Sequence, residues 1–351
     1  MKNKILKYGS QSINNDDILS VSEVLKSDYL TTGPVSENFN KKLKDKLNVK
    51  YVSTCSSGTA ALHLSMLAIG LKKGDNVILP AINFIASINM CHNLGAKIYL
   101  ADVDKYTGQM TPQTLEDCIK SNNIKKIRAV VTMYNGGSPL NFKEFYKLKK
   151  RYNFFLIEDA CHALGAKYSI KKKYYVGNCK YSDIATFSLH PVKSITSGEG
   201  GIISTNNKHI FKKIELLKNH GIIRKKSTLM TYIWNYKVVV PGYNFRLSDI
   251  SSALGLSQLN RLDKFIKTRN KNFKIYQKFL KKFHAYLNLP ILVQDLLSAN
   301  HLYIVNLNPK NLGLSRDKFI QELFKFKILC QVHYIPIFFH PYYKSLKNKN
   351  L

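Results

Sequence analysis

The sequence predicts an α/β protein whose core is a mostly parallel sheet covered by helices. From about residue 50, short apolar segments alternate with segments of roughly 12 residues that have helical periodicity. Residues 76–80 (NVILP) and 127–134 (IRAVVTMY) illustrate the apolar segments, and residues 59–71 (TAALHLSMLAIGL) and 141–153 (NFKEFYKLKKRYN) illustrate the helical ones. Because parallel strands need long crossover connections, this alternation is typical of a parallel sheet with helices on its faces. In such sheets, ligands bind where strands end and helices begin.

The character of the sequence changes after about residue 250, which predicts a second, smaller domain. Residues 247–283 have apolar positions three to four residues apart and predict a long helix that an interruption could divide. In the mixed region that follows we expect a strand over 301–307, a helix over 315–326 capped by Ser315, and a strand over 331–338. The predicted domains are a large α/β domain over 1–250 and a small α+β domain over 251–351.

The chain is strongly basic: 54 Lys and Arg residues against 22 Asp and Glu residues give a formal net charge of +32. One interpretation is a polyanionic partner such as nucleic acid. The other is a compositional bias towards Lys, Asn and Ile, which is favoured because the lysine pairs and triplets lie in separate segments. We therefore expect no nucleic-acid partner, although a basic surface favours a small anionic substrate.

Cysteine spacing and apolar runs bear on metal binding and on location. The six cysteines are scattered without the spacing of a metal site, so we expect free thiols and no metal. No apolar run reaches the roughly 18 residues of a membrane-spanning helix. The N-terminal MKNKILKYGS lacks the apolar stretch of a secretion signal. The sequence therefore predicts a soluble cytoplasmic protein with no role in a membrane.

Residues 187–201 (FSLHPVKSITSGEGG) place Lys193 in unusual surroundings for a lysine. An apolar, strand-like run precedes it, and a glycine-rich turn and a second apolar strand follow it. This arrangement predicts a side chain near the interior, where burial lowers the pKa of an amine. A half-buried lysine of this kind can act as a nucleophile or form a Schiff base.

Residues 55–64 (CSSGTAALHL) place Gly58 and Thr59 between a strand and a helix. The first N–H groups of a helix, with the helix dipole behind them, bind phosphate well. Gly58 lets the backbone approach a ligand closely, and the Thr59 hydroxyl adds a donor. The alternative is an ordinary turn in which a Ser or Thr caps the helix, and the motif alone leaves both open.

Three further side chains lie near predicted strand ends, and Asn244 lies in a loop before the long helix. Asp159 ends the apolar strand of FLIEDACHALGA, where it either pairs with a cationic ring nitrogen or caps a helix. His162 either faces the same ligand or is a core histidine. Phe84 either stacks on a planar ring or belongs to the core.

Together these motifs fit one ligand that has a phosphate, a flat ring, a basic ring nitrogen and an aldehyde. Pyridoxal phosphate has all four. The protein would keep its ring nitrogen protonated through Asp159 and would offer Lys193 to its aldehyde. The order of the motifs along the chain, phosphate loop, aspartate and then lysine, also suits this cofactor.

The sequence resembles the DegT/StrS-type sugar aminotransferases, which are fold-type I pyridoxal-phosphate enzymes. Five ordered motifs carry the resemblance: SSGTAALHL, EDACHALGA, FSLHPVKSITSGEGG, NHGI and GYNFRLSDISSALGLSQL. It extends from about residue 6 to about residue 345 and implies a three-layer, aspartate-aminotransferase-like fold. Two segments, YGSQSINNDDILSVSEVLKSDYLTTGP and WNYKVVVPGYNFRLSDI, are similar to those of the 4-aminotransferases of pseudaminic acid biosynthesis.

The resemblance implies roles around the cofactor ring for four residues. Lys193 would form the Schiff base and then shuttle a proton between the cofactor and C4 of the sugar. Asp159 would pair with the pyridine nitrogen. His162 would lie by the ring and its phenolic oxygen, and Phe84 would stack on the ring.

The resemblance also implies how phosphate and substrate are held. The phosphate would be bound by Gly58, Thr59 and Ser188, and by Asn244 of the neighbouring subunit, so the working unit would be a homodimer with shared active sites. Thr31 and His333 match segments near the sugar nucleotide.

The implied reaction is a ping-pong transfer of an amino group from L-glutamate to C4 of a UDP-linked 4-keto-6-deoxy-N-acetylhexosamine. Relatives with histidine in place of Lys193 are sugar dehydratases, so the lysine argues against that activity. Family members usually continue beyond HPYYKSLKNKNL, and we therefore expect a shortened small domain. The alternative that this leaves is a non-catalytic or impaired protein that still binds the cofactor.

Overall fold

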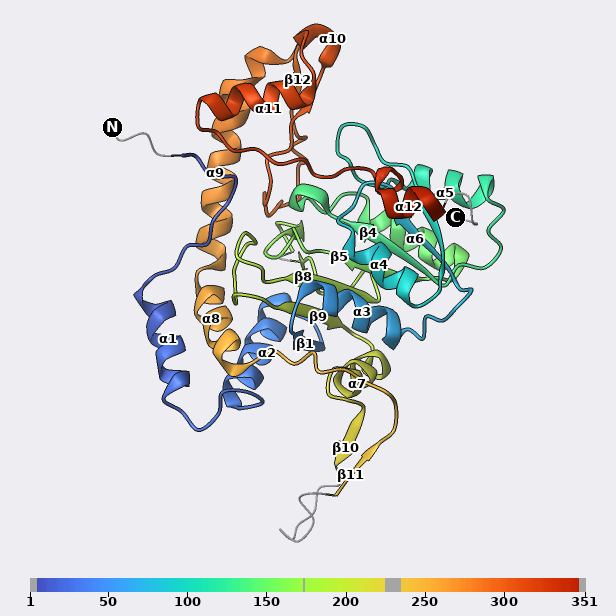
Figure 1. Ribbon diagram of the computed structural model, residues 1–351, viewed down its shortest axis with the longest axis vertical. Helices are drawn as coiled ribbons and strands as arrows, with labels where there is room; N and C mark the ends of the chain where they lie inside the picture. Colours follow the sequence, from blue (N-terminus) through green and yellow to red (C-terminus); the bar gives the residue numbers. More distant parts are fainter. Residues whose placement is uncertain (1–4, 173, 225–234, 347–351) are drawn as a thin grey trace.

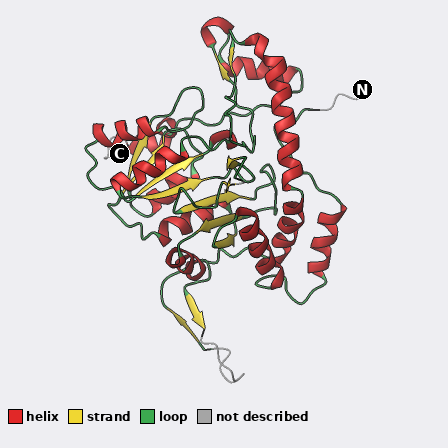
Figure 2. Ribbon diagram, turned by 180° about the vertical axis from the view of Figure 1, so that it is seen from behind, coloured by secondary structure: helices red, strands yellow, loops and turns green. Residues whose placement is uncertain are grey.

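The structure is a computed structural model that describes residues 5–172, 174–224 and 235–346. Its centre is a seven-stranded sheet with the order β1-β9-β8-β5-β4-β2-β3, and helices lie on both sides of it (Figures 1 and 2). The strands are Tyr51–Cys55 (β1), Asn76–Pro80 (β2), Lys97–Ala101 (β3), Ala129–Met133 (β4), Phe155–Asp159 (β5), Ile184–Ser188 (β8) and Gly201–Thr205 (β9). The predicted α/β architecture is confirmed.

The sheet is parallel except at β9, which pairs antiparallel with both β1 and β8. β8 and β9 are joined by residues 189–200, which contain no helix. Because a parallel return requires a crossover connection, usually through a helix, this short loop turns the chain back alongside β8. The loop that carries Lys193 therefore starts at the carboxyl end of β8, beside the end of β5.

Both faces of the sheet are buried, which explains why its strands are almost continuously apolar. One face packs on α3 (Gly58–Ala68), α4 (Ala86–Asn93) and α7 (Lys208–Leu217), and Val77 belongs to that core. The other packs on α5 (Pro112–Ser121) and α6 (Phe142–Tyr152), and its core includes Ile78. Neighbouring residues of one strand thus enter different cores, as the pleat requires.

The long helix predicted over 247–283 is divided into α8 (Asp249–Asn260) and α9 (Leu262–Leu280), with the break at Arg261. α8 packs against α1 (Asn15–Leu25) and α2 (Pro34–Leu47). The buried carboxylate of Asp17 in α1 accepts hydrogen bonds from Ser257 (2.6 Å) and Gln258 (2.6 Å) of α8. These bonds fix the N-terminal segment to the body of the protein.

Beyond α9 lie short elements at its far end: β12 (Leu287–Asn288), β13 (Asn306–Leu307), α10 (Pro309–Leu312) and α11 (Arg316–Lys325) (Figure 1). Ser315 caps α11 by accepting a bond from the Lys318 N–H (3.3 Å), so the helix predicted there is confirmed. α12 (Pro341–Leu346) follows, with short 3-10 turns at Asn135–Gly137, Lys281–Phe283 and Ile337–Phe339. The division into two domains at residue 250 stays a prediction.

The strands predicted over 301–307 and 331–338 are wrong. In the first, only the last two residues pair with β12, because the backbone before them bonds to a loop: the Leu302 N–H donates to the Gly136 carbonyl (3.3 Å). In the second, Pro336 has no N–H to donate, and the Ile337 N–H donates to the Ala81 carbonyl (2.9 Å). Both segments thus bond to residues that follow strands of the large sheet, Gly136 after β4 and Ala81 after β2, and only Asn306–Leu307 pair in a small sheet.

Two short hairpins complete the fold. β6 (Lys167–Ser169) pairs with β7 (Tyr174–Tyr175), and β10 (Ile222–Arg224) pairs with β11 (Tyr236–Val238). The second hairpin points away from the rest of the protein (Figures 1 and 2). In the part of the chain that the structure describes, no helix has both the length and the apolar character needed to cross a membrane.

Glu158 and Asp159 are neighbours at the end of β5 but point to opposite faces of the sheet. Glu158 is buried and accepts hydrogen bonds from the hydroxyls of Tyr134 (2.5 Å), Tyr168 (2.6 Å) and Ser182 (2.9 Å). A buried carboxylate is tolerated only with partners of this kind. Glu158 therefore belongs to the framework, and Asp159 alone faces the site.

Candidate active site

Lys193 lies on the β8–β9 loop, where its backbone is held at two points. Its N–H donates to the His190 carbonyl (2.9 Å), and its carbonyl accepts a bond from Arg269 of α9 (3.3 Å). The side chain is half-buried, and this burial lowers the pKa of the amine, whereas Cys161 and Asp159 act in the opposite direction. A lysine with a lowered pKa has a larger share of the neutral, nucleophilic amine.

The junction between β1 and α3 forms a cradle that an anion fits. Ser57 is the helix cap, because its Oγ accepts a bond from the Ala60 N–H (3.0 Å). A Cβ on Gly58 would lie 2.9 Å from the Cβ of Ser188 and 3.4 Å from the Sγ of Cys161, so the helix start touches the ends of β8 and β5. Thr59 is exposed at this point. The first N–H groups of a helix lack intrahelical acceptors, and the cradle thus suits a phosphate group.

Asp159 is a buried carboxylate at the end of β5. Its Oδ1 accepts a bond from the Cys161 N–H (3.2 Å). Burial raises its pKa, while the bonds from Cys161 and the charge of Lys193 lower it. Since desolvation disfavours the carboxylate, a protonated ring nitrogen placed beside it would stabilise its charge. The residues present therefore fit pyridoxal phosphate at both its phosphate and its ring nitrogen.

His162 is buried among other rings and is held as a neutral imidazole. Its pKa lies well below the ordinary value, mainly because of burial, with contributions from His301, Lys193 and His333. The Gly136 N–H donates to its Nδ1 (3.4 Å), so the ring proton lies on Nε2, which faces the Tyr334 hydroxyl at 3.1 Å. The tautomer is therefore fixed by the backbone.

His333 is held by the N-terminal segment, which sequence reasoning left out of the site. The Tyr8 hydroxyl lies 2.9 Å from its Nε2, and the two rings stack with centroids 5.3 Å apart. Two backbone bonds hold this segment beside the strandless region after α11: the Leu6 N–H donates to Lys327 (2.8 Å), and the Leu329 N–H donates to Leu6 (3.0 Å). The segment thus supports His333, whose ring lies 6.3 Å from that of His162.

The remaining predicted residues lie at the surface. Phe84 is half exposed and tilts against the Tyr334 ring, with centroids 5.9 Å apart. Thr31 is exposed and pairs with Ser248 ahead of α8, and Asn244 is exposed at the base of the β10–β11 hairpin. The structure therefore brings Gly58, Asp159, His162, Ser188 and Lys193 together, with His333 close to His162, and leaves Thr31 and Asn244 facing outwards.

Four residues of this region were missed from the sequence: Tyr8, Arg269, His301 and Tyr334. Arg269 had a signal, because it lies between the apolar positions 266 and 273 and so belongs to the buried side of the predicted helix. His301 and Tyr334 fall in segments that were predicted to be strands, and the sequence did not indicate that their side chains point towards Lys193.

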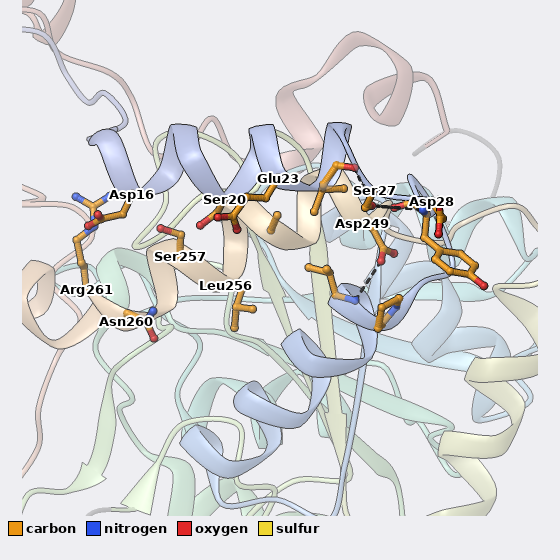
Figure 3. Close-up of a pocket in the computed structure, with 15 residues that line it drawn as sticks. Asp16, Ser20, Glu23, Ser27, Asp28, Asp249, Leu256, Ser257, Asn260 and Arg261 are labelled. Atoms are coloured by element: carbon orange, nitrogen blue, oxygen red, sulfur yellow. Dashed lines mark hydrogen bonds between the residues drawn. The ribbon is translucent and has the colours of Figure 1, made fainter.

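A cavity away from Lys193 lies between α1 and α8. It has a volume of about 590 Å³, and Figure 3 shows Asp16 and Glu23 of α1 opposite Ser257 and Asn260 of α8 and Arg261 at its end. Asp249 at one end accepts bonds from the N–H groups of Gly33 (3.0 Å) and Val35 (3.1 Å). The Asp249 carboxylate thus holds the start of α2 in place, and no residue of the Lys193 site lines the cavity.

The fold and the site define a pyridoxal-phosphate-dependent transferase: a half-buried lysine, a buried aspartate and an anion cradle converge at the carboxyl ends of β1, β5 and β8. The chain belongs to the DegT/DnrJ/EryC1/StrS aminotransferase family, whose model matches residues 11–351. Members of this family are pyridoxal-phosphate enzymes, and the predicted cofactor and aminotransferase class are confirmed.

Individual relatives agree with this assignment. The chain is 35% identical over 343 residues to the UDP-4-amino-4,6-dideoxy-N-acetyl-beta-L-altrosamine transaminase of Campylobacter jejuni, covering 97% of this chain and 87% of the relative. It resembles the structure of Helicobacter pylori PseC, an aminotransferase of pseudaminic acid biosynthesis, with a TM-score of 0.88, 30% identity and coverage of 98% and 89%. A putative sugar aminotransferase of Streptococcus pneumoniae in its PMP form gives a TM-score of 0.88 at 26% identity, with coverage of 97% and 88%.

We predict that Lys193 reacts with an amine-directed acylating reagent at lower pH than the exposed Lys212 does. Only a neutral amine is nucleophilic, and burial lowers the pKa of Lys193. Labelling of the two peptides across a pH series, quantified by mass spectrometry, gives the midpoints. Asp159→Asn should move the Lys193 midpoint lower still, because that carboxylate favours the charged amine. Coincident midpoints for the two lysines in the wild type would contradict the account.

Proposed function

We propose that this chain transfers an amino group from L-glutamate to C4 of a UDP-linked 4-keto-6-deoxy-N-acetylhexosamine, in the synthesis of pseudaminic-acid-type or related surface sugars. The observation that carries the proposal is the meeting of Lys193, Asp159 and the Gly58–Ser188 cradle at one edge of the sheet. Amino transfer needs a nucleophilic amine, a fixed negative charge and a phosphate anchor, and these three groups supply them.

Each residue of the site has a distinct part. Pyridoxal phosphate, when bound, supplies an aldehyde and an electron-withdrawing ring. Lys193 would hold the aldehyde and, when free, would act as the neutral base that moves a proton to or from the reacting carbon of the substrate. Asp159 would keep the ring nitrogen charged, Phe84 would stack on the ring, and Gly58, Thr59 and Ser188 would hold the phosphate. His162 would lie beside the ring and its phenolic oxygen, with its orientation held by Gly136 and Tyr334.

The sugar nucleotide is the substrate that the surroundings favour. His333 and Thr31 contact it in the proposal, and the net charge of +32 attracts its diphosphate. The Campylobacter relative is a transaminase of a UDP-linked 4-amino-4,6-dideoxy sugar by its name, which supports C4 as the position that accepts the amine. Both substrates are water-soluble metabolites, and we propose that the reaction takes place in the cytoplasm.

A homodimer with shared sites is the proposed working unit. Ile223, Tyr236 and Val238 of the β10–β11 hairpin are 51%, 54% and 61% exposed, although apolar side chains of this size are favoured in contacts. Asn244 follows directly at the base of this hairpin and is exposed. A second copy that covers the hairpin would bring Asn244 to the phosphate of the opposite site.

The proposed substrates are tested by following the nitrogen atom. The chain is incubated with pyridoxal phosphate, ¹⁵N-labelled L-glutamate and UDP-linked 4-keto-6-deoxy-N-acetylhexosamines of both configurations at C5. We expect ¹⁵N on C4 of one product by NMR and mass spectrometry, none with the 4-hydroxy sugar UDP-N-acetylglucosamine, and none with Lys193→Ala. If 2-oxoglutarate forms but neither keto sugar gains nitrogen, the sugar assignment is wrong.

Shared sites are tested by mixing two inactive variants, Lys193→Ala and Asn244→Ala, under conditions that let subunits exchange. If Asn244 completes the opposite site, each mixed dimer has one intact site, and activity recovers to roughly a quarter of the wild-type value. Lys193→Ala mixed with Asp159→Ala is the control, because both residues serve the same site and no recovery is expected. If activity recovers in neither mixture, the shared site is refuted.

A further inference from the structure

Arg269 carries a positive charge close to Lys193 and forms no ion pair with the described acidic side chains. It is half-buried on the inner side of α9, and among the described residues no carboxylate oxygen lies within 4.0 Å of it. Its Nη1 donates to the His301 carbonyl (3.0 Å) and its Nη2 to the Lys193 carbonyl (3.3 Å). These carbonyls satisfy two of its donors but leave its charge without a counter-ion, which costs free energy in a partly buried place.

His301 gives a second, independent indication at the same point. The residue is only 7% exposed, and neither ring nitrogen has a hydrogen-bond partner among the described residues. A neutral imidazole carries one N–H donor, and burying it without an acceptor is unfavourable. The ring lies against His162, with centroids 4.5 Å apart, so the unused nitrogen belongs to the same group of side chains as Lys193.

We propose that Arg269 and His301 form a carboxylate-binding corner that receives the α-carboxylate of the amino-acid donor. One anionic oxygen pair would balance the guanidinium and would accept the unpaired imidazole N–H, which satisfies both observations with one ligand. The inference rests on the proposed function, because it names the contact by which the first substrate is recognised.

The position of the corner favours the donor over the sugar nucleotide. Arg269 bonds the main chain of Lys193 itself, and the amine of the donor must come to the place that the Lys193 amine marks. In an α-amino acid the carboxylate is attached to the carbon that carries the amine. In the sugar nucleotide the diphosphate is on C1, on the far side of the ring from the C4 that reacts.

The test compares two donors that differ only at this group, L-glutamate and its α-amide, L-isoglutamine. The rate of the first half-reaction is followed by stopped-flow absorbance at a range of donor concentrations. Because a charge-assisted hydrogen bond is at stake, the wild type should prefer L-glutamate by about 10- to 100-fold in kcat/KM. In Arg269→Gln the preference should fall towards equality, in Arg269→Lys part of it should remain, and in His301→Phe it should be reduced.

Further measurements separate recognition from folding and from the sugar step. Glutarate, which has carboxylates but no amine, should raise the Tm of the wild type more than that of either variant. Lys271→Gln, at an exposed position of α9, is the matched control and should keep the full preference for L-glutamate. The KM for the keto sugar in the second half-reaction should be unchanged in Arg269→Gln and in His301→Phe. If Arg269→Gln does not fold, His301→Phe alone provides the test.

Four outcomes would overturn the inference. If Arg269→Gln slows both donors equally, the guanidinium only anchors the Lys193 loop. If the KM of the keto sugar rises while the donor preference stays, the corner binds the diphosphate instead. If the wild type transfers no nitrogen from any amino acid, the proposed function fails and this inference fails with it, whereas normal transfer without donor preference removes the inference alone.

Discussion

The placement of Asp159 and Lys193 at one edge of the sheet is the constraint on which the site depends. Burial destabilises the charge of each group, and each partly restores the charge of the other. To bring them together, the chain must place the ends of β5 and β8 side by side, and the register that pairs Asp159 with Thr186 does so. The antiparallel return at β9 then keeps the Lys193 loop at that edge, where a crossover helix would have carried it away.

The surroundings of this pair are polar but almost free of other acids. Burial lowers the pKa of His162, His301 and His333, so these rings add little positive charge to the site. Lys193 and Arg269 remain as the cations. A site with this balance attracts anions from solution and at the same time keeps its lysine deprotonated often enough to react.

Much of the fold could be predicted from the sequence because it depends on local pattern. The sheet strands, their covering helices and the caps at Ser248 and Ser315 follow from periodicity and capping chemistry. The segments around His301 and His333 could not, since their apolar alternation serves contacts with the loops at Gly136 and Ala81, which are far away in sequence. The backbone conformation of these two segments depends on contacts with residues far away in the sequence, which local patterns do not reveal.

The site residues also differ in whether local sequence or distant contacts determine their position. Lys193, Asp159 and Gly58 were predictable because each lies at a strand end in a motif whose chemistry is specific. Tyr8 was not, since it reaches His333 only after the N-terminal segment has crossed to the region after α11, and no local pattern records that path. The orphaned ring of His301 also becomes visible only when all of its neighbours are in place.

The most direct test of the central claim is the absorbance spectrum of the protein with pyridoxal phosphate, before and after L-glutamate is added. The account predicts that the wild type gains a near-visible band when the aldehyde is held by Lys193, and that L-glutamate bleaches this band. Lys193→Ala should bind the cofactor through its phosphate without forming that band. A wild-type spectrum that equals the sum of free cofactor and protein, or a band that persists in Lys193→Ala, would contradict the role given to this lysine.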